Sequence, residues 1–222
     1  MKFLRKIRQK FIQLHDIIII DKIQLLKGKI SILYNLLLYP NFKIEKPYWV
    51  WGKLFIRMYE PNNQFISIGK ELRLVSNPYR AGITLFSPSK ITTFNNSIVK
   101  IGNHVGLSGT VISCRKSISI GDYTMIAPNV IILDTDFHPL WPPENRWTEQ
   151  GLEYDKEVVI GSNVWIGMNT IILKGSIIGD NSIIGAGSVV SGTIPPNVIA
   201  GGNPVKVIRE MNISKTNQNE KN

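Results

Sequence analysis

The sequence predicts an all-β fold, a parallel β-helix built from hexapeptides. Between residues 160 and 190 an aliphatic residue returns at every sixth position, and five of these six residues are followed by Gly or Ser. The six are Ile160, Ile166, Ile172, Ile178, Ile184 and Val190. A period of six fits neither the 3.6 residues of a helical turn nor the alternation of an ordinary strand. One short strand and one turn per hexapeptide reproduce it.

A second regularity runs inside the repeat. The fifth position of each hexapeptide, counted from the aliphatic residue, is small or β-branched. These residues are Val164, Thr170, Ser176, Ser182 and Ser188. We expect three repeats to form one triangular coil, with the aliphatic side chains inside and the small ones packed at the corners.

An earlier block of the chain follows the same rule. Ile101 and Leu107 are six residues apart, and so are Ile120, Ile126 and Ile132. Thirteen residues separate Leu107 from Ile120, where two repeats would take twelve. One inserted residue near positions 114–117, as a bulge at a corner, explains the slip.

Residues 133–159 interrupt the two blocks. This stretch holds three Pro and two Trp, and it cannot keep the repeat. It must leave the coil as an excursion, and long excursions from a rigid scaffold are where function concentrates.

The N-terminal segment is a separate, basic feature. Residues 1–60 hold twelve Lys or Arg against four acidic residues, so they carry +8 of the formal net charge of +10. Apolar residues at helical spacing, with basic residues between them, predict an amphipathic helix. They are Phe3, Leu4, Ile7, Phe11 and Leu14. Residues 1–14 either dock on the coil end or a neighbouring subunit, or bind an anionic membrane surface. No nucleic-acid-binding motif accompanies the charge.

These observations divide the chain into three parts. We expect a basic helical extension over residues 1–60 and a β-helix over residues 61–208 with its loop at 133–159. A short helix turn and a polar, disordered tail follow over residues 209–222. A single Cys rules out an intrachain disulfide. The N-terminal residues have neither a signal-peptide pattern nor a long uninterrupted apolar run. We therefore expect a cytoplasmic protein, either free or in peripheral contact with the inner membrane.

The repeats, the loop DTDFHP at 134–139 and the dense closing stretch at 158–210 together resemble the hexapeptide-repeat acetyltransferases. The similarity covers residues 98–210. It is greatest to the branch of galactoside and maltose O-acetyltransferases and of enzymes that acetylate sugars of bacterial surface polysaccharides. The resemblance implies a left-handed β-helix, a homotrimer with active sites between subunits, and acetyl-CoA as donor, with no metal.

The resemblance implies that His138 is the catalytic base. A hydroxyl needs proton removal to attack a thioester, and an imidazole, whose ordinary pKa is about 6.5, suits this task. The other histidines are His15, in the basic segment, and His104, at a turn of the repeat. We expect Asp136 to orient His138, with Asp134 as the alternative; both aspartates would otherwise cap the turn.

Further site residues follow from the family match. Coenzyme A contacts are implied for Met168, Ala186, Ser191, Gly192 and Trp165, and phosphate contacts for Lys206 and Arg209. Acceptor contacts are implied for Ser108, and Trp141 suits stacking on a sugar ring. Trp165 could instead pack at a corner, and Lys206 and Arg209 could lie in a solvated helix turn.

We expect an O-acetyltransferase acting on a sugar, with N-acetylation of an amino-sugar nucleotide as the alternative. Two other functions share the fold. A carbonic anhydrase of the γ type needs three metal-binding His, and the repeat region offers only His104 and His138. A non-catalytic β-helix scaffold would not bind coenzyme A.

Overall fold

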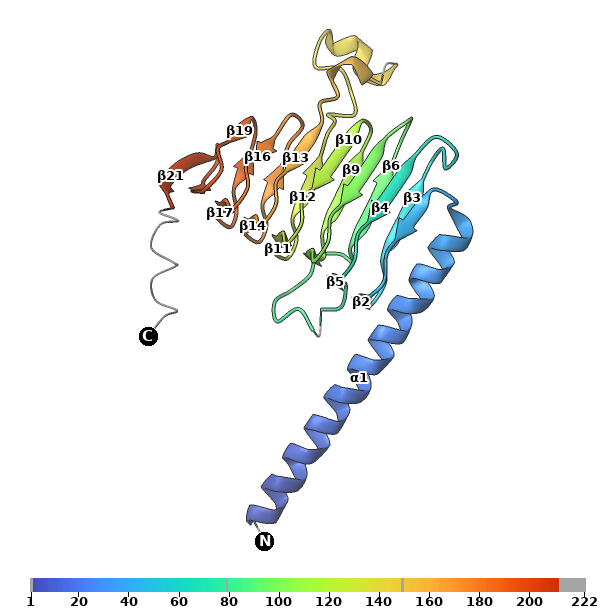
Figure 1. Cartoon of the computed structure of the whole chain (residues 1–222), viewed down its shortest axis with the longest axis vertical. Helices are drawn as coiled ribbons and strands as arrows, with labels where there is room; N and C mark the ends of the chain where they lie inside the picture. Colours follow the sequence, from blue (N-terminus) through green and yellow to red (C-terminus); the bar gives the residue numbers. More distant parts are fainter. Residues whose placement is uncertain (1, 79, 149, 212–222) are drawn as a thin grey trace.

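The computed structural model describes residues 2–78, 80–148 and 150–211, with the side chains of residues 2–17 left out. The apolar stripe predicted between Phe3 and Leu14, His15 and the polar tail from residue 212 lie outside these described side chains. In the described part, one helix precedes a prism of three parallel sheets (Figure 1). The helix α1 spans Lys2–Leu38.

Each strand pairs with the strand three places later in the chain, which is the topology of a β-helix. Sheet A contains β1 (Phe42–Ile44), β4 (Phe65–Ile68), β7 (Ile98–Ile101), β10 (Ser117–Ile120), β13 (Val158–Ile160), β16 (Ile177–Ile178) and β19 (Thr193–Ile194). Sheet B contains β2 (Tyr48–Trp51), β5 (Leu72–Val75), β8 (Gly106–Ser108), β11 (Met125–Ile126), β14 (Trp165–Ile166), β17 (Ile183–Ile184), β20 (Val198–Gly201) and β21 (Lys206–Glu210). Sheet C contains β3 (Phe55–Met58), β6 (Lys90–Thr93), β9 (Val111–Cys114), β12 (Ile131–Leu133), β15 (Ile171–Ile172) and β18 (Val189–Val190). The fold is a left-handed parallel β-helix, contrary to the usual right-handed crossover.

The six-residue register is confirmed. Ile120 pairs with Ile160, and Ile160 with Ile178, so equivalent repeats stack directly. The aliphatic side chains of the repeat are buried in one continuous core, and each contributes about 1.5–3 kcal/mol by leaving water. The small residues are buried at the corners, where their hydroxyls bond backbone carbonyls; the Ser188 hydroxyl, for example, donates to the Gly185 carbonyl at 2.6 Å.

The phase slip has two parts rather than one inserted residue. Ile112, not residue 113, takes the inward position, because it pairs with Ile132 in sheet C. The step from Leu107 to Ile112 is therefore five residues, one fewer than a repeat, and the step from Ile112 to Ile120 is eight residues, two more than a repeat. The extra residues widen the corner between β9 and β10.

His104 belongs to a column of turn residues at the corner between sheets A and B. Equivalent residues there adopt nearly the same positive φ, which is 57° at His104, 58° at Tyr123 and 55° at Asn163. The His104 ring stacks on Tyr123 at 4.5 Å between centroids, and its Nδ1 lies 3.1 Å from Glu71 Oε2. His104 is thus a surface residue of the corner, as its place in the turn predicts.

Helix α1 covers the N-terminal end of the coil. Its inner face supplies partners to backbone groups that a first coil would leave unpaired: the Gly52 N–H donates to the Gln24 carbonyl, and Ser31 and Asn35 bond the Leu54 backbone. Gly28 allows the close approach, since a Cβ there would lie 1.9 Å from the Val50 carbonyl oxygen. The helix thereby protects the open sheet edges.

Two predicted boundaries differ from the structure. The first coil begins at Phe42, so the boundary at residue 60 falls inside the β-helix. The predicted helix turn after residue 208 is instead the end of β21, which folds back antiparallel on β20 and covers that edge of sheet B. The hydrogen bonds that β21 gains along the edge of β20 outweigh those that a single helix turn would form.

The predicted excursion leaves the coil between β12 and β13 and projects from the corner between sheets C and A (Figure 1). It contains two 3₁₀ turns, Pro143–Trp147 and Leu152–Tyr154. A second loop, residues 76–89, leaves the corner between sheets B and C. Asn129 holds it by bonding the Phe86 N–H and the Thr84 carbonyl.

Coil stacking should be sensitive to a single methyl group at Gly121. A Cβ there would lie 2.6 Å from backbone atoms of Gly161 and Ser162 in the next coil. We expect Gly121→Ala to lower the free energy of unfolding by about 1–3 kcal/mol in urea titrations followed by circular dichroism. Gly106→Ala is the matched control, because its Cβ would meet only Met125 Cγ at 3.7 Å. Equal losses in the two variants would contradict the stacking argument.

Candidate active site

Asp134 ties the start of the excursion to the coil below it. Its side chain is fully buried, and its carboxylate accepts the backbone N–H groups of Arg115, Lys116 and Ser117, each at 2.8 Å. These donors belong to the widened corner between β9 and β10. Asp134 is therefore a structural anion in a nest of amides and is not free to orient His138.

Arg115 clamps the two ends of the excursion together. Its guanidinium donates to the Gln150 carbonyl at 2.8 Å and to the Thr135 hydroxyl at 3.3 Å, and its Nε lies 3.5 Å from Asp155 Oδ2. Both charged side chains of the ion pair are about 95% buried. Burial raises the pKa of Asp155, while the Thr135 hydrogen bond and the Arg115 charge oppose the rise.

Asp136 is held by the coil above the excursion. Its Oδ2 lies 2.5 Å from the Nζ of Lys174, at the next corner between sheets C and A. The same ammonium lies 5.7 Å from the centre of the Tyr154 ring. Among the described residues, neither Asp136 nor Asp134 hydrogen-bonds His138, so the orienting role of Asp136 stays a prediction.

His138 is exposed at a fixed turn. Phe137 adopts a φ of 67°, and its N–H donates to the Thr135 hydroxyl at 2.9 Å. Gly151 packs against the peptide that follows His138, and a Cβ there would lie 2.7 Å from Pro139 N. The backbone that carries the imidazole is thus positioned from both sides.

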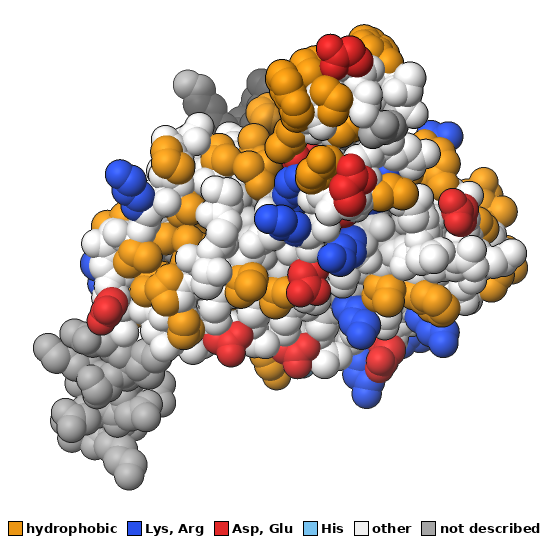
Figure 2. All heavy atoms as spheres, turned by 90° about the horizontal axis from the view of Figure 1, so that it is seen from above, with side chains coloured by type: hydrophobic (Ala, Val, Ile, Leu, Met, Phe, Trp, Pro, Cys, Tyr) orange, Lys and Arg blue, Asp and Glu red, His pale blue; other side chains and the backbone are white. Residues whose placement is uncertain are grey.

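An open cavity of about 530 Å³ adjoins His138 and is lined also by Pro143, Arg146 and Trp147. Trp147 is 94% exposed and Trp141 is 74% exposed. Figure 2 shows hydrophobic side chains gathered on the projecting excursion. Such exposed rings need a covering partner or ligand.

Cys114 has no nucleophilic role. It is fully buried, with its Sγ 3.2 Å from Asp134 Oδ2. Burial raises the pKa of the thiol well above its ordinary value, and the negative charge of Asp134 raises it further. The thiolate needed for covalent catalysis is therefore disfavoured.

Two of the residues expected to contact coenzyme A lie on another corner of the prism. Met168 and Ala186 stack one above the other between sheets B and C, where the Gly187 N–H donates to the Met168 carbonyl at 2.8 Å. The amide N–H groups of Met168 and Ala186 donate to no other described residue. These two amides are available to a ligand.

The other predicted residues lie either on the corner that carries the excursion or on sheet B. Ser191 and Gly192 follow β18 and are exposed on the same corner as the excursion. Trp165 is half-exposed on sheet B, and Lys206 and Arg209 are exposed on β21. Ser108 ends β8, also in sheet B. A single chain therefore carries Asp136, Trp141 and His138 on the excursion, but it holds Met168, Ala186 and Ser108 on a different edge of the prism.

The sequence interpretation missed the residues that anchor the excursion: Arg115, Gln150, Gly151, Asp155 and Lys174. The phase slip at residues 114–117 was the available signal, since it marks a widened corner next to the excursion. Within the described residues, no three His, Cys, Asp or Glu side chains gather as a metal site. In the same part of the chain, no helix is long and apolar enough to cross a bilayer.

The comparison with known proteins finds a family match in the repeats that follow the excursion. A profile of the family "Bacterial transferase hexapeptide (six repeats)" matches residues 157–192. Galactoside O-acetyltransferase of Escherichia coli is 48% identical over 96 residues, which is 43% of this chain and 45% of that protein. Polysialic acid O-acetyltransferase of Neisseria meningitidis is 30% identical over 116 residues, covering 47% of this chain and 53% of that protein.

The fold matches a solved structure over most of its length. AntD, an N-acyltransferase from Bacillus cereus, was solved as a point mutant with dTDP-4-amino-4,6-dideoxyglucose and coenzyme A. It gives a TM-score of 0.57 at 19% identity, covering 82% of this chain and 90% of that one. The sequence matches span about half the length of the two O-acetyltransferases. The chain thus resembles the hexapeptide-repeat acetyltransferases, with the family profile matching residues 157–192.

Proposed function

We propose that this protein transfers an acetyl group from acetyl-CoA to a hydroxyl of a sugar, with His138 as general base. One observation carries the proposal: an exposed imidazole stands beside an open cavity, on a loop that the neighbouring coils hold at Asp134 and Asp136. A general base has to be accessible to the acceptor and held in place, and His138 meets both conditions.

The chemistry needs three functions from the chain. His138 accepts the proton of the attacking hydroxyl as the new C–O bond forms at the thioester carbon. The free amide N–H of Met168 is the candidate donor to the developing oxyanion, as backbone amides serve in acyl transfer. His138 then returns the proton to the departing sulfur as the C–S bond breaks, so the imidazole ends neutral.

Direct attack by the acceptor agrees with the state of the only thiol. An acetyl-enzyme on Cys114 would need a thiolate in a fully buried position beside the Asp134 carboxylate. The proposal therefore contains a single transfer step.

The acceptor class is inferred from the loop and from the relatives. Trp147 lines the cavity at His138, and Trp141 is exposed on the same excursion. Flat apolar rings of this kind suit stacking on a sugar. The names of the two relatives, galactoside O-acetyltransferase and polysialic acid O-acetyltransferase, describe enzymes that acetylate sugar hydroxyls. We therefore propose that the acceptor is a sugar of a surface polysaccharide and that the reaction takes place in the cytoplasm. An amino-sugar nucleotide, acetylated on nitrogen, is the alternative.

The division of the site between two edges of the prism supports an oligomer. His138 projects from the corner between sheets C and A, whereas Met168 and Ala186 lie between sheets B and C. A neighbouring copy can bring its free amides to the excursion of the first, and a ring of three copies satisfies every site. Contact of residues 1–14 with an anionic membrane remains a separate prediction.

Replacing His138 with Ala should lower turnover by about 10²–10⁴-fold with little change in coenzyme A affinity, because general-base catalysis is lost while the groove is intact. Acetyl-CoA consumption is measured against a panel of oligosaccharides, nucleotide sugars and lipid-linked sugars. Cys114→Ser is the control and should retain turnover. Near-normal turnover of folded His138→Ala would refute the assignment, and coenzyme A failing to bind the parent chain would favour a scaffold.

The second prediction is a homotrimer with three times the chain mass of 25.1 kDa. Light scattering at micromolar concentration measures this mass directly. An active monomer would contradict the shared site, because one chain holds the two halves on separate edges.

Lys206 and Arg209 are predicted to pair with the phosphates of coenzyme A, since both are exposed cations on β21. Either Lys206→Ala or Arg209→Ala should raise the KM for acetyl-CoA severalfold, with a smaller effect at high salt. Lys90→Ala, an exposed lysine on sheet C, is the matched control. Unchanged KM values would place the phosphates elsewhere.

A further inference from the structure

The outer face of α1 is at odds with its role as a cap. Its inner face is satisfied: Ile32 and Asn35 are buried against the first coil, and Ser31 bonds the Leu54 backbone. The cap of a solenoid ordinarily turns a polar face to solvent, because nothing stacks beyond it. Here the face that points away from the coil is apolar.

The apolar face has a regular arrangement. Six aliphatic residues recur three or four positions apart, so they form one stripe along the helix. They are Ile19, Ile23, Leu26, Ile30, Leu33 and Leu37, and they are 40–76% exposed. Further exposed aliphatic residues, including Ile18, Ile20, Leu36 and Leu38, widen the stripe on both sides. A contiguous apolar surface of this kind marks a site of association.

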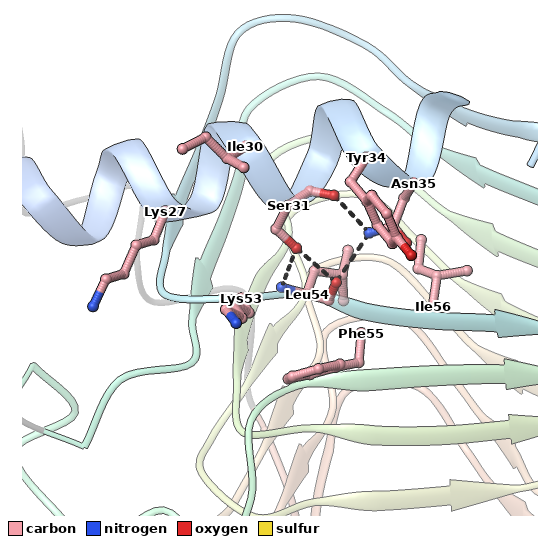
Figure 3. Close-up of a pocket in the computed structure, with 9 residues that line it drawn as sticks. All are labelled: Lys27, Ile30, Ser31, Tyr34, Asn35, Lys53, Leu54, Phe55 and Ile56. Carbon is pink, nitrogen blue, oxygen red and sulfur yellow. Dashed lines mark hydrogen bonds between the residues drawn. The ribbon is translucent and has the colours of Figure 1, made fainter. Parts of the chain in front are cut away.

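Lysines border the stripe on both sides, and each side has a groove. One groove, of about 300 Å³, lies between α1 and β3 and includes Lys27 of the helix and Lys53 of the coil (Figure 3). The other, of about 570 Å³, includes Lys29 of the helix and Lys46 of the coil, with Trp49. Each groove thus combines apolar lining with two ammonium groups.

Two polar side chains of the first groove, Ser31 and Asn35, are already hydrogen-bonded. Ser31 and Asn35 turn toward Leu54 and bond its backbone, while Lys27 and Lys53 lie toward one end of the groove and Tyr34 and Ile56 toward the other (Figure 3). What the groove still offers a ligand is apolar surface and positive charge. That combination suits an amphiphile with an anionic head.

The charge of the surface selects between two occupants. In residues 18–38 the only acidic residue is Asp21, and it pairs with Arg80. Two copies packed face to face would bring together the lysines of both copies, Lys22, Lys27 and Lys29, with no acidic partner between them. An anionic bilayer instead receives the stripe at the acyl boundary, while the flanking lysines reach the phosphates. Since the described residues contain no spanning helix, the helix would lie in the interface.

We propose that residues 18–38 of α1, together with Lys46 and Lys53, form a docking surface for an anionic lipid bilayer. The surface is separate from residues 1–14 and from the candidate active site, and it does not depend on the proposed acetyl transfer. Aromatic rings at its margin, Tyr34 and Trp49, have the amphipathic character found at membrane interfaces.

The test is flotation of the full chain with phosphatidylcholine–phosphatidylglycerol vesicles and with pure phosphatidylcholine vesicles. We expect binding to the anionic vesicles that falls with added salt. The variant Leu26→Gln/Ile30→Gln/Leu33→Gln and the variant Lys27→Glu/Lys29→Glu should each weaken binding about tenfold or more. The variant Lys90→Glu/Lys100→Glu changes the net charge equally at exposed strand positions and should bind as the parent.

Light scattering on the same samples identifies the competing occupant. A lower oligomeric mass in the glutamine variant would show that the stripe joins copies of this chain, and the proposal would be wrong. Failure of the parent to float with anionic vesicles, or equal loss in both charge variants, would also overturn it. If the glutamine variant does not fold, the pair of charge variants still decides the outcome.

Discussion

The stacking of one coil directly on the next is the constraint on which the rest of this structure depends. Parallel strands at a constant spacing force equivalent turn residues into columns, so that each corner repeats its chemistry along the whole prism. The glycines at the corner between sheets A and B allow this contact, as at Gly121 against Gly161. Departures from the repeat are possible only where the chain leaves the prism at a corner.

The excursion shows how the stacked coils hold such a departure. It leaves the coil formed by β10–β12 after β12 and enters the next coil at β13. The corner below provides the amides that bind Asp134 and the guanidinium of Arg115, and the corner above provides Lys174 for Asp136. The rigid prism therefore positions His138 through neighbours on both sides, although the loop itself has almost no regular structure.

The clamp includes an electrostatic cost. Asp155 Oδ1 is buried without a partner among the described residues, and burial raises the pKa of this carboxyl. Because the folded pKa is above the ordinary value, the unfolded chain loses its proton first as pH rises, and stability declines between the two pKa values. The Arg115 charge limits this loss. Removing Arg115 would leave an uncompensated buried carboxylate, which costs about 3–5 kcal/mol in such pairs.

Much of the fold followed from the sequence, because a six-residue period has a single structural solution in which Ile160, Ile166 and Ile172 all point inward. The corner positions of Ser182 and Ser188 followed in the same way. The six-residue period is absent from the first coils, so it could not predict them. The coils before Ile98 have longer strands and a loop at residues 76–89, so the β-helix was predicted to begin too late. The partners of Arg115 and Asp134 are 17 to 40 residues away in the chain, and only the stacked coils bring them together.

The same constraint sets the position of the excursion relative to α1. Helix α1 covers the first coil, and the excursion leaves the fourth, so three strand spacings separate them along the prism. At about 4.8 Å per spacing this is a fixed separation of about 15 Å. A chain docked through the outer face of α1 would hold His138 above the headgroups by this separation plus the thickness of the helix, which is about 10 Å. That height is within reach of a glycan that stands off the membrane rather than of the headgroups themselves. A flexible linker could not set such a distance, whereas a solenoid sets it by the number of its coils.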